Sequence, residues 1–225
     1  MRLRDTDFNF IGLPVRRRLL ISVPFLSTGG ALAVFILTGI SLRVGMIVAA
    51  VLVAGAVVLV RTRLPEPSRR LVRSQAVRGI AAGLLATAAY DLCRLTVVSL
   101  TGITYWPFDV FSRFGRLLVG DAAPTGVAVA VGTGYHYLNG VGFAIAYMLF
   151  VRRPGILTGL AWAALLEVFM VSLYPGWLGL RALGEFLSVS IAGHAAYGVV
   201  LGATALAWRQ RAGEGRPASA RRGVH

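Results

Sequence analysis

The chain contains no lysine and a single cysteine among its 225 residues. The absence of lysine excludes Schiff-base chemistry at a lysine side chain, and the lone Cys93 excludes an intramolecular disulfide. Charged residues make up only 14% of the sequence, whereas hydrophobic residues make up 56%. With a mean hydropathy of +0.72, this composition is too apolar for an ordinary soluble domain and predicts a protein embedded in a bilayer.

Acidic residues are also scarce, because nine of them stand against 23 arginines and leave a net charge of +14. The basic segments carry no nucleic-acid-binding motif, so we expect no nucleic-acid partner. Loops outside a membrane account for the excess of positive charge. The expected partner is the lipid bilayer, with anionic headgroups beside the basic cytoplasmic segments, above all the loop predicted over residues 62–77.

Six apolar segments approach the ~20 residues that a helix needs to cross the hydrocarbon core. They cover residues 19–40, 44–60, 80–100, 127–151, 155–175 and 186–208. The predicted fold class is therefore all-α, a polytopic membrane helix bundle over residues 1–208. Residues 209–225 form a basic cytoplasmic tail with few apolar side chains to bury, and we expect this tail to be disordered.

Arginine is distributed unevenly over the segments between these spans. If the N-terminus is cytoplasmic, eighteen of the 23 arginines lie in cytoplasmic segments and four in outer segments, while Arg94 lies within a span. Arginine-rich loops are retained on the cytoplasmic side of a membrane. The sequence therefore predicts six spans with both termini in the cytoplasm.

The outer loop, residues 101–126, contains an amphipathic helical pattern. Its apolar face carries aromatic and aliphatic residues at helical spacing, namely Phe108, Phe111, Phe114 and Leu118. Pro107 in the first turn and Gly120 after the last turn fit the start and the end of a helix. We favour an interfacial connector that floats at headgroup depth, and the alternative is a lid over an outer cavity.

Five ionisable residues lie within the predicted spans, where such side chains are costly and tend to face the bundle interior. They come from four different spans and are Asp91, Arg94, His136, Glu167 and His194. At a rise of ~1.5 Å per residue, all five lie about 9–13 Å below the outer ends of their helices. The sequence therefore predicts one polar layer in the outer half of the bundle.

Helical periodicity indicates which way the two histidines point. His136 shares a stripe with Gly132 and Gly140, and His194 shares one with Gly198. Because small residues let a neighbouring helix approach closely in a membrane, both histidines are expected to face the bundle interior. Each should lie within reach of a charged residue of the layer. We assign Tyr90 to a different helix face, as a packing residue.

The polar layer suggests roles for individual side chains. The candidate acids and bases are Asp91, Glu167, His136 and His194, and the candidate substrate-binding residues are Arg94, Asn139 and Tyr197. Arg94 lies three residues after Asp91 on one helix, so the two side chains can meet. Arg94 then either neutralises Asp91, orients it toward a histidine, or holds an anionic substrate.

A metal or a haem is a further hypothesis for the same residues. His136, His194 and Glu167 are candidate metal ligands, with Asp91 as a fourth ligand or an outer partner. The two histidines are alternatively the axial ligands of one haem. No compact metal-binding spacing such as His-x-x-x-His occurs in the sequence. The sequence therefore does not decide whether the protein binds a metal, a haem or neither.

A resemblance rests on residues 135–142 (YHYLNGVG) in the fourth span and residues 194–202 (HAAYGVVLG) in the sixth. Together they resemble small multi-pass inner-membrane protein families of bacteria, over the C-terminal half of the chain. The resemblance implies a location in the inner membrane and supports the choice of His136 and His194. It implies no reaction.

Three classes of function remain open. The polar layer is the hydrogen-bonded core of an accessory or structural protein, with or without a bound lipophilic ligand, or the acid–base machinery of an enzyme acting on a lipophilic substrate. The third class is a proton-linked transporter that uses the layer as a relay. We place transport third because no internal repeat and no helix broken at the midplane is evident.

Overall fold

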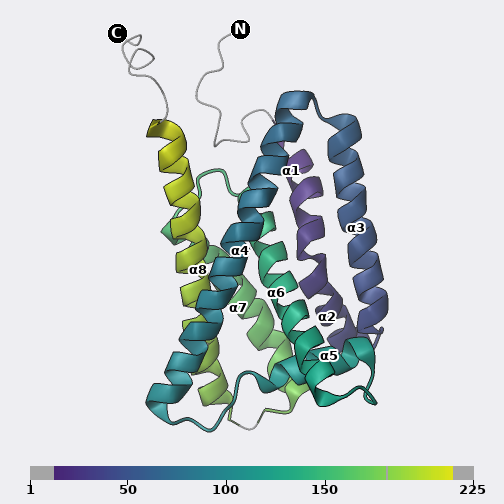
Figure 1. Ribbon diagram of the computed structural model, residues 1–225, viewed down its shortest axis with the longest axis vertical. Helices are drawn as coiled ribbons and strands as arrows, with labels where there is room; N and C mark the ends of the chain where they lie inside the picture. The colour runs from purple at the N-terminus through teal and green to yellow at the C-terminus, as the bar shows by residue number, and fades with distance from the viewer. Residues whose placement is uncertain (1–12, 181, 215–225) are drawn as a thin grey trace.

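The computed structural model of the protein describes residues 13–180 and 182–214, and over these residues the fold is all-α, as the sequence predicts. Figure 1 shows long helices lying side by side in a bundle, with the short α5 across one end. In chain order the elements are α1 (Val15–Ser22), the 3-10 helix η1 (Val23–Leu26), α2 (Ser27–Thr38), α3 (Leu42–Arg63), α4 (Glu66–Thr101), α5 (Asp109–Val119), α6 (Thr125–Phe150), α7 (Ile156–Leu178) and α8 (Leu183–Glu214).

Within the described residues, five helical segments are long and apolar enough to cross a membrane. They are Val15–Thr38, which joins α1, η1 and α2, then Leu42–Arg63, Glu66–Thr101, Ile156–Leu178 and Leu183–Arg211. Each overlaps one predicted span. The remaining predicted span, residues 127–151, forms the 26-residue helix α6, which is long enough to cross but less apolar because polar residues such as His136 and Asn139 occupy its middle.

The connection between α3 and α4 corrects one expectation. Instead of a loop over residues 62–77, α3 continues to Arg63 and α4 begins at Glu66. Pro67 lies in the first turn of α4, where its missing N–H costs no helical hydrogen bond. The basic segment is therefore built into the ends of two helices.

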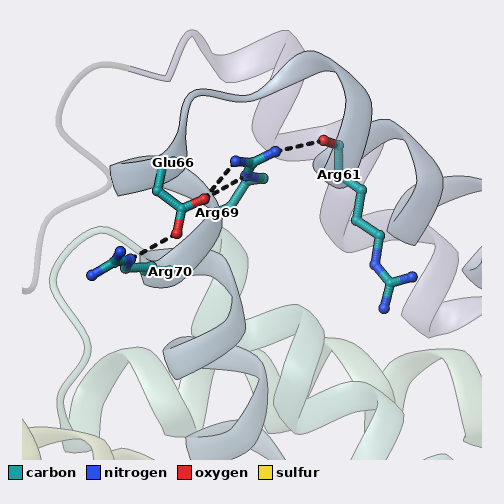
Figure 2. A network of polar contacts seen from close by, with 4 residues as sticks. All are labelled: Arg61, Glu66, Arg69 and Arg70. Atoms are coloured by element: carbon teal, nitrogen blue, oxygen red, sulfur yellow. Dashed lines mark hydrogen bonds and ion pairs between the residues drawn. The ribbon is translucent and has the colours of Figure 1, made fainter.

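Ion pairs at the start of α4 explain why this segment is helical (Figure 2). The Glu66 carboxylate accepts hydrogen bonds from Arg69 at 2.5 Å and from Arg70 at 2.8 Å. Pairs of opposite charge three and four residues apart favour the helical conformation. Arg69 also donates to the backbone carbonyl of Arg61 at 2.9 Å, which ties the start of α4 to the end of α3.

The long helices alternate in direction, so that the connections gather at the two ends of the bundle (Figure 1). The start of α1, the α3–α4 turn, the α6–α7 connection and the end of α8 lie at the upper end, and α5 lies at the lower end. The arginine-rich segments that we predict to be cytoplasmic thus share one end. α8 extends through Glu214, so residues 209–214 of the predicted tail are helical, and residues 215–225 lie outside the described residues.

Glycines set how closely the helices pack. A Cβ atom built on Gly198 of α8 would lie 2.7 Å from the carbonyl oxygen of Gly159 in α7, and one built on Gly83 of α4 would lie 2.6 Å from Cα of Val141 in α6. The predicted close approach along the sixth span is therefore confirmed. Close backbone approach provides the van der Waals contact on which helix association in a membrane depends.

α5 forms where the sequence predicts it and ends at Gly120, whose φ of 98° favours glycine. It does not float, however. A Cβ atom on Gly132 of α6 would collide with the carbonyl group of Phe111, and one on Gly115 would collide with the backbone of Ala128. The predicted connector is therefore not free of the bundle, because paired glycines dock α5 directly on α6, and its place at headgroup depth stays a prediction.

The outer faces of the bundle are apolar. α3 packs chiefly against α2, and its side chains Val44, Ile47 and Val51 are exposed to 50%, 65% and 64%. α7 likewise exposes Leu157 and Val168. Exposed apolar surface on this scale is unusual for a soluble monomer and is compatible with a membrane protein.

Candidate functional site

A cavity of about 380 Å³ lies between α2, α4, α6, α7 and α8. Its walls are mostly apolar, with Gly29, Gly30 and Ala33 of α2 and leucine, phenylalanine and methionine side chains of α7. Arg94, His136 and His194 of the predicted polar layer line it, as do the candidate substrate-binding residues Asn139 and Tyr197. Asp91 and Glu167 are not among the lining residues, so the two carboxylates stand behind the histidines.

The first carboxylate–histidine pair joins α4 to α6. Nε2 of His136 lies 3.2 Å from Oδ1 of Asp91, and Nη1 of Arg94 donates to the same oxygen at 3.2 Å. The predicted contact between Asp91 and Arg94 is therefore confirmed, and the arrangement matches the hypothesis that Arg94 orients Asp91 toward a histidine. Because three residues from two helices share one oxygen atom, the pair fixes α4 against α6.

The second pair joins α7 to α8 and is more buried. Nδ1 of His194 lies 2.7 Å from Oε2 of Glu167, and the Ser190 hydroxyl donates to the same oxygen at 2.6 Å. Nδ1 also lies 3.1 Å from the carbonyl oxygen of Ser190. Since both neighbours of Nδ1 are acceptors, this nitrogen carries a hydrogen.

The two pairs meet at Tyr90, which is a packing residue as predicted but lies on the same side of α4 as Arg94, not on a different face. Tyr90 is buried, and its ring centroid lies 5.7 Å from the ring of His136 and 4.9 Å from that of His194. The Arg94 guanidinium lies 4.8 Å from the same ring centroid. The four-residue spacing of Tyr90 and Arg94 places both on one side of α4, and this was the signal in the sequence.

The geometry does not support the metal and haem hypotheses. In residues 13–180 and 182–214, no three His, Cys, Asp or Glu side chains come together as a metal site requires. His136 pairs with Asp91, whereas His194 pairs with Glu167, so the predicted ligands are divided between two sites. A haem would need an open slot between the two imidazoles, but Tyr90 packs against both.

Two oxygen atoms in the cavity wall lack a partner. Oγ1 of Thr87 and Oδ1 of Asn139 are buried and form no hydrogen bond within the described residues, although both residues line the cavity. Tyr197 differs, because its hydroxyl donates to the carbonyl oxygen of Gly140 at 2.7 Å. A buried polar atom without a partner costs free energy, so these two oxygens are the wall positions best suited to a ligand.

Tyr105, in the loop between α4 and α5, lines the cavity together with Val110 and Phe114 of α5. The Glu185 carboxylate of α8 accepts a hydrogen bond from the backbone N–H of Tyr105 at 2.8 Å, and Nη2 of Arg94 donates to the carbonyl oxygen of Pro107 at 2.5 Å. Burial raises the pKa of Tyr105, and the nearby Arg94 opposes that shift. The phenol of Tyr105 therefore stays neutral beside the cavity.

A family model matches residues 73–214 of the chain, which contain α5–α8, most of α4, and every residue of the two carboxylate–histidine pairs. α1, α2 and α3 precede the matched region. No curated protein and no solved structure matches the chain. Because the match covers more than half of its length, the chain belongs to the family described as a family of unknown function (DUF6789).

Proposed function

We propose that the protein crosses the inner membrane of a bacterial cell six times, with both termini in the cytoplasm. The arginine-rich segments share one end of the bundle (Figure 1), which supports that orientation. Of the six proposed crossings, α6 is the one that is not among the helices apolar enough to be candidate membrane spans. Its polar residues face α4 and the cavity rather than lipid, so they do not prevent a helix of this length from crossing.

Labelling of cysteines at the two ends of α6 tests this topology. In a Cys93→Ala background, Arg153→Cys is expected to react with a membrane-impermeant maleimide only after the cells are opened. Asp121→Cys is expected to react in intact cells once the outer membrane is permeabilised. Both positions are exposed, so accessibility differs only by membrane side. Reaction of both cysteines from the same side would show that α6 does not cross.

We further propose that the cavity binds a lipophilic molecule that carries a small polar group. One observation carries this proposal: Thr87 and Asn139, each with a buried oxygen atom that forms no hydrogen bond within the described residues, line a cavity whose walls are mostly apolar. Ligand sites combine such an apolar wall with a few convergent polar groups. A hydroxyl or amide N–H of the ligand would donate to these oxygens, while its hydrocarbon part would fill the space between α2 and α7.

The cavity reaches the apolar surface of the bundle on α7. Leu165 and Phe169 line the cavity, yet they are 62% and 54% exposed. α2 and α7 make few contacts with each other, so little packing has to be broken between them. These features support entry of the ligand from the hydrocarbon core of the bilayer.

A cavity-filling substitution tests the proposal. Gly30 lines the cavity, and a Cβ atom built on it meets no atom within 4 Å, so Gly30→Leu should occupy the space without a backbone collision. Gly55 on α3 is equally open but does not line the cavity, and Gly55→Leu is the matched control. Native mass spectrometry of detergent-purified protein should find a lipophilic molecule retained by the wild type and by Gly55→Leu but lost from Gly30→Leu. Equal retention by both variants would contradict the proposal.

A membrane-embedded acid–base enzyme is the second candidate, and the carboxylate behind each histidine favours it. In such a pair the carboxylate holds one imidazole nitrogen, which leaves the other to take up or deliver a proton. Asp91 with His136 and Glu167 with His194 would supply two such groups.

The molecules recovered from the purified protein distinguish the candidates, since an enzyme would return a chemically altered product and a binding protein would return the same molecule. A proton transporter, or an accessory protein without a bound ligand, would retain no such molecule.

A further inference from the structure

Arg18 on α1 differs from the arginines beside it. Arg16 and Arg17 are exposed, as expected for a helix end at a membrane surface, whereas Arg18 is only 5% exposed. Its guanidinium lies 5.3 Å from the ring centroid of Phe150, the last residue of α6. The helix thus turns this one cation of three toward the bundle.

The guanidinium of Arg18 has no acidic partner. Within residues 13–180 and 182–214 it forms no hydrogen bond or ion pair, and its Nε is buried without any hydrogen-bond partner. A buried charge without a counter-ion is costly. The ring of Phe150 offsets only part of that cost, because a cation–π contact is weaker than a charge-assisted hydrogen bond.

A second positive charge near Arg18 increases the need for a counter-ion. Arg152, two residues beyond the end of α6, is close enough to repel Arg18 electrostatically. Glu66, the acid at the start of α4, is already engaged by Arg69 and Arg70 (Figure 2). Arg18 and Arg152 are therefore two cations at the arginine-rich end of the bundle, and neither forms an ion pair with a carboxylate of the described residues.

We propose that Arg18 and Arg152 bind a phosphate group at this end of the bundle. A phosphate presents several oxygens to the rigid donors of a guanidinium and is the anion that arginine recognises best. Arg18 lies near the start of the span Val15–Thr38, at the level where phospholipid headgroups meet the hydrocarbon core. The phosphate can belong to an anionic lipid or be free in solution, and the site is separate from the cavity.

Thermal unfolding of the full-length protein in nanodiscs tests this site. With phosphatidylcholine alone as the reference, adding phosphatidylglycerol should raise the unfolding temperature of the wild type and of Arg17→Gln. In Arg18→Gln, the concentration of phosphatidylglycerol needed for half of that rise should increase about tenfold or more. Arg17→Gln is the matched control, because it removes the same charge one residue away.

Additional measurements identify the source of the phosphate, and a second variant is used in case the first does not fold. Stabilisation of detergent-purified wild type by millimolar inorganic phosphate, lost in Arg18→Gln, supports the site and assigns it to free phosphate. If Arg18→Gln does not fold, Arg152→Gln serves instead, because Arg152 is exposed, and it should weaken the same response.

Equal responses of Arg17→Gln and Arg18→Gln would overturn the proposal, as would the absence of any response in the wild type. A loss of stability in Asp5→Asn, Asp7→Asn equal to that in Arg18→Gln would likewise overturn it, by identifying a carboxylate of the N-terminal segment as the counter-ion.

Discussion

Replacing Glu167 with alanine is expected to lower the free energy of unfolding by about 3–5 kcal/mol. Glu167 is buried, and its Oε2 accepts a hydrogen bond from the Ser190 hydroxyl at 2.6 Å and lies 2.7 Å from Nδ1 of His194 in an ion pair. The substitution leaves the buried Ser190 hydroxyl without its acceptor and removes the carboxylate beside His194. It also removes a side chain that links α7 to α8.

Two controls isolate this effect. Glu167→Gln keeps the shape of the side chain and an acceptor for Ser190, so it should cost less than alanine. Asp121→Ala removes an exposed acid in the turn before α6 and should leave stability within about 0.5 kcal/mol of the wild type. The measurement is reversible unfolding in mixed micelles, followed by circular dichroism. A Glu167→Ala protein as stable as Asp121→Ala would show that the buried pair does not form.

The second large effect is expected at the contact between α5 and α6. Gly132→Ala places a Cβ atom against the carbonyl group of Phe111, so α5 must move away from α6, at a cost of about 1–3 kcal/mol or more. Gly134→Ala lies one half-turn away on the same helix, where a Cβ atom meets nothing within 4 Å. It should be neutral or slightly stabilising, because alanine favours a helix over glycine.

Limited proteolysis detects the movement directly. In Gly132→Ala, cleavage after Arg113 and Arg116 of α5 should become faster than in the wild type, because a helix that leaves its docking surface is more readily unfolded. Gly134→Ala should be cut at the wild-type rate. Equal cleavage of the two variants would mean that α5 is not held by α6.

Much of the bundle follows from local signals in the sequence. Every predicted span overlaps helical structure, the first of them in three consecutive pieces, α1, η1 and α2, because long apolar segments leave few other structures in a bilayer. The contact between Asp91 and Arg94 follows from their spacing on one helix, and the pairing of each histidine with a carboxylate follows from the cost of isolated charges in lipid. Each of these inferences uses only the spacing of residues along one helix or the depth of residues within the predicted spans.

The features that the sequence analysis missed depend on contacts between helices. Which histidine pairs with which carboxylate is decided by the neighbours of each helix, and no periodicity contains that information. The docking of α5 rests on Gly115 and Gly132, two glycines that gain meaning only when they face a backbone. The role of Thr87 in a cavity wall appears only when α6 and α7 are in place.

The location of a bound lipophilic probe tests the central claim most directly. Dodecanol carrying a diazirine at the end of its chain can be photolysed in membranes that contain the protein, and the labelled peptides identified by mass spectrometry. If the cavity holds a lipophilic molecule, the label should map to Ala33 on α2 and to Phe169 and Met170 on α7, and excess unlabelled dodecanol should suppress it. Label confined to outward-facing residues such as Ile47 and Val51 on α3, and insensitive to the competitor, would contradict the account.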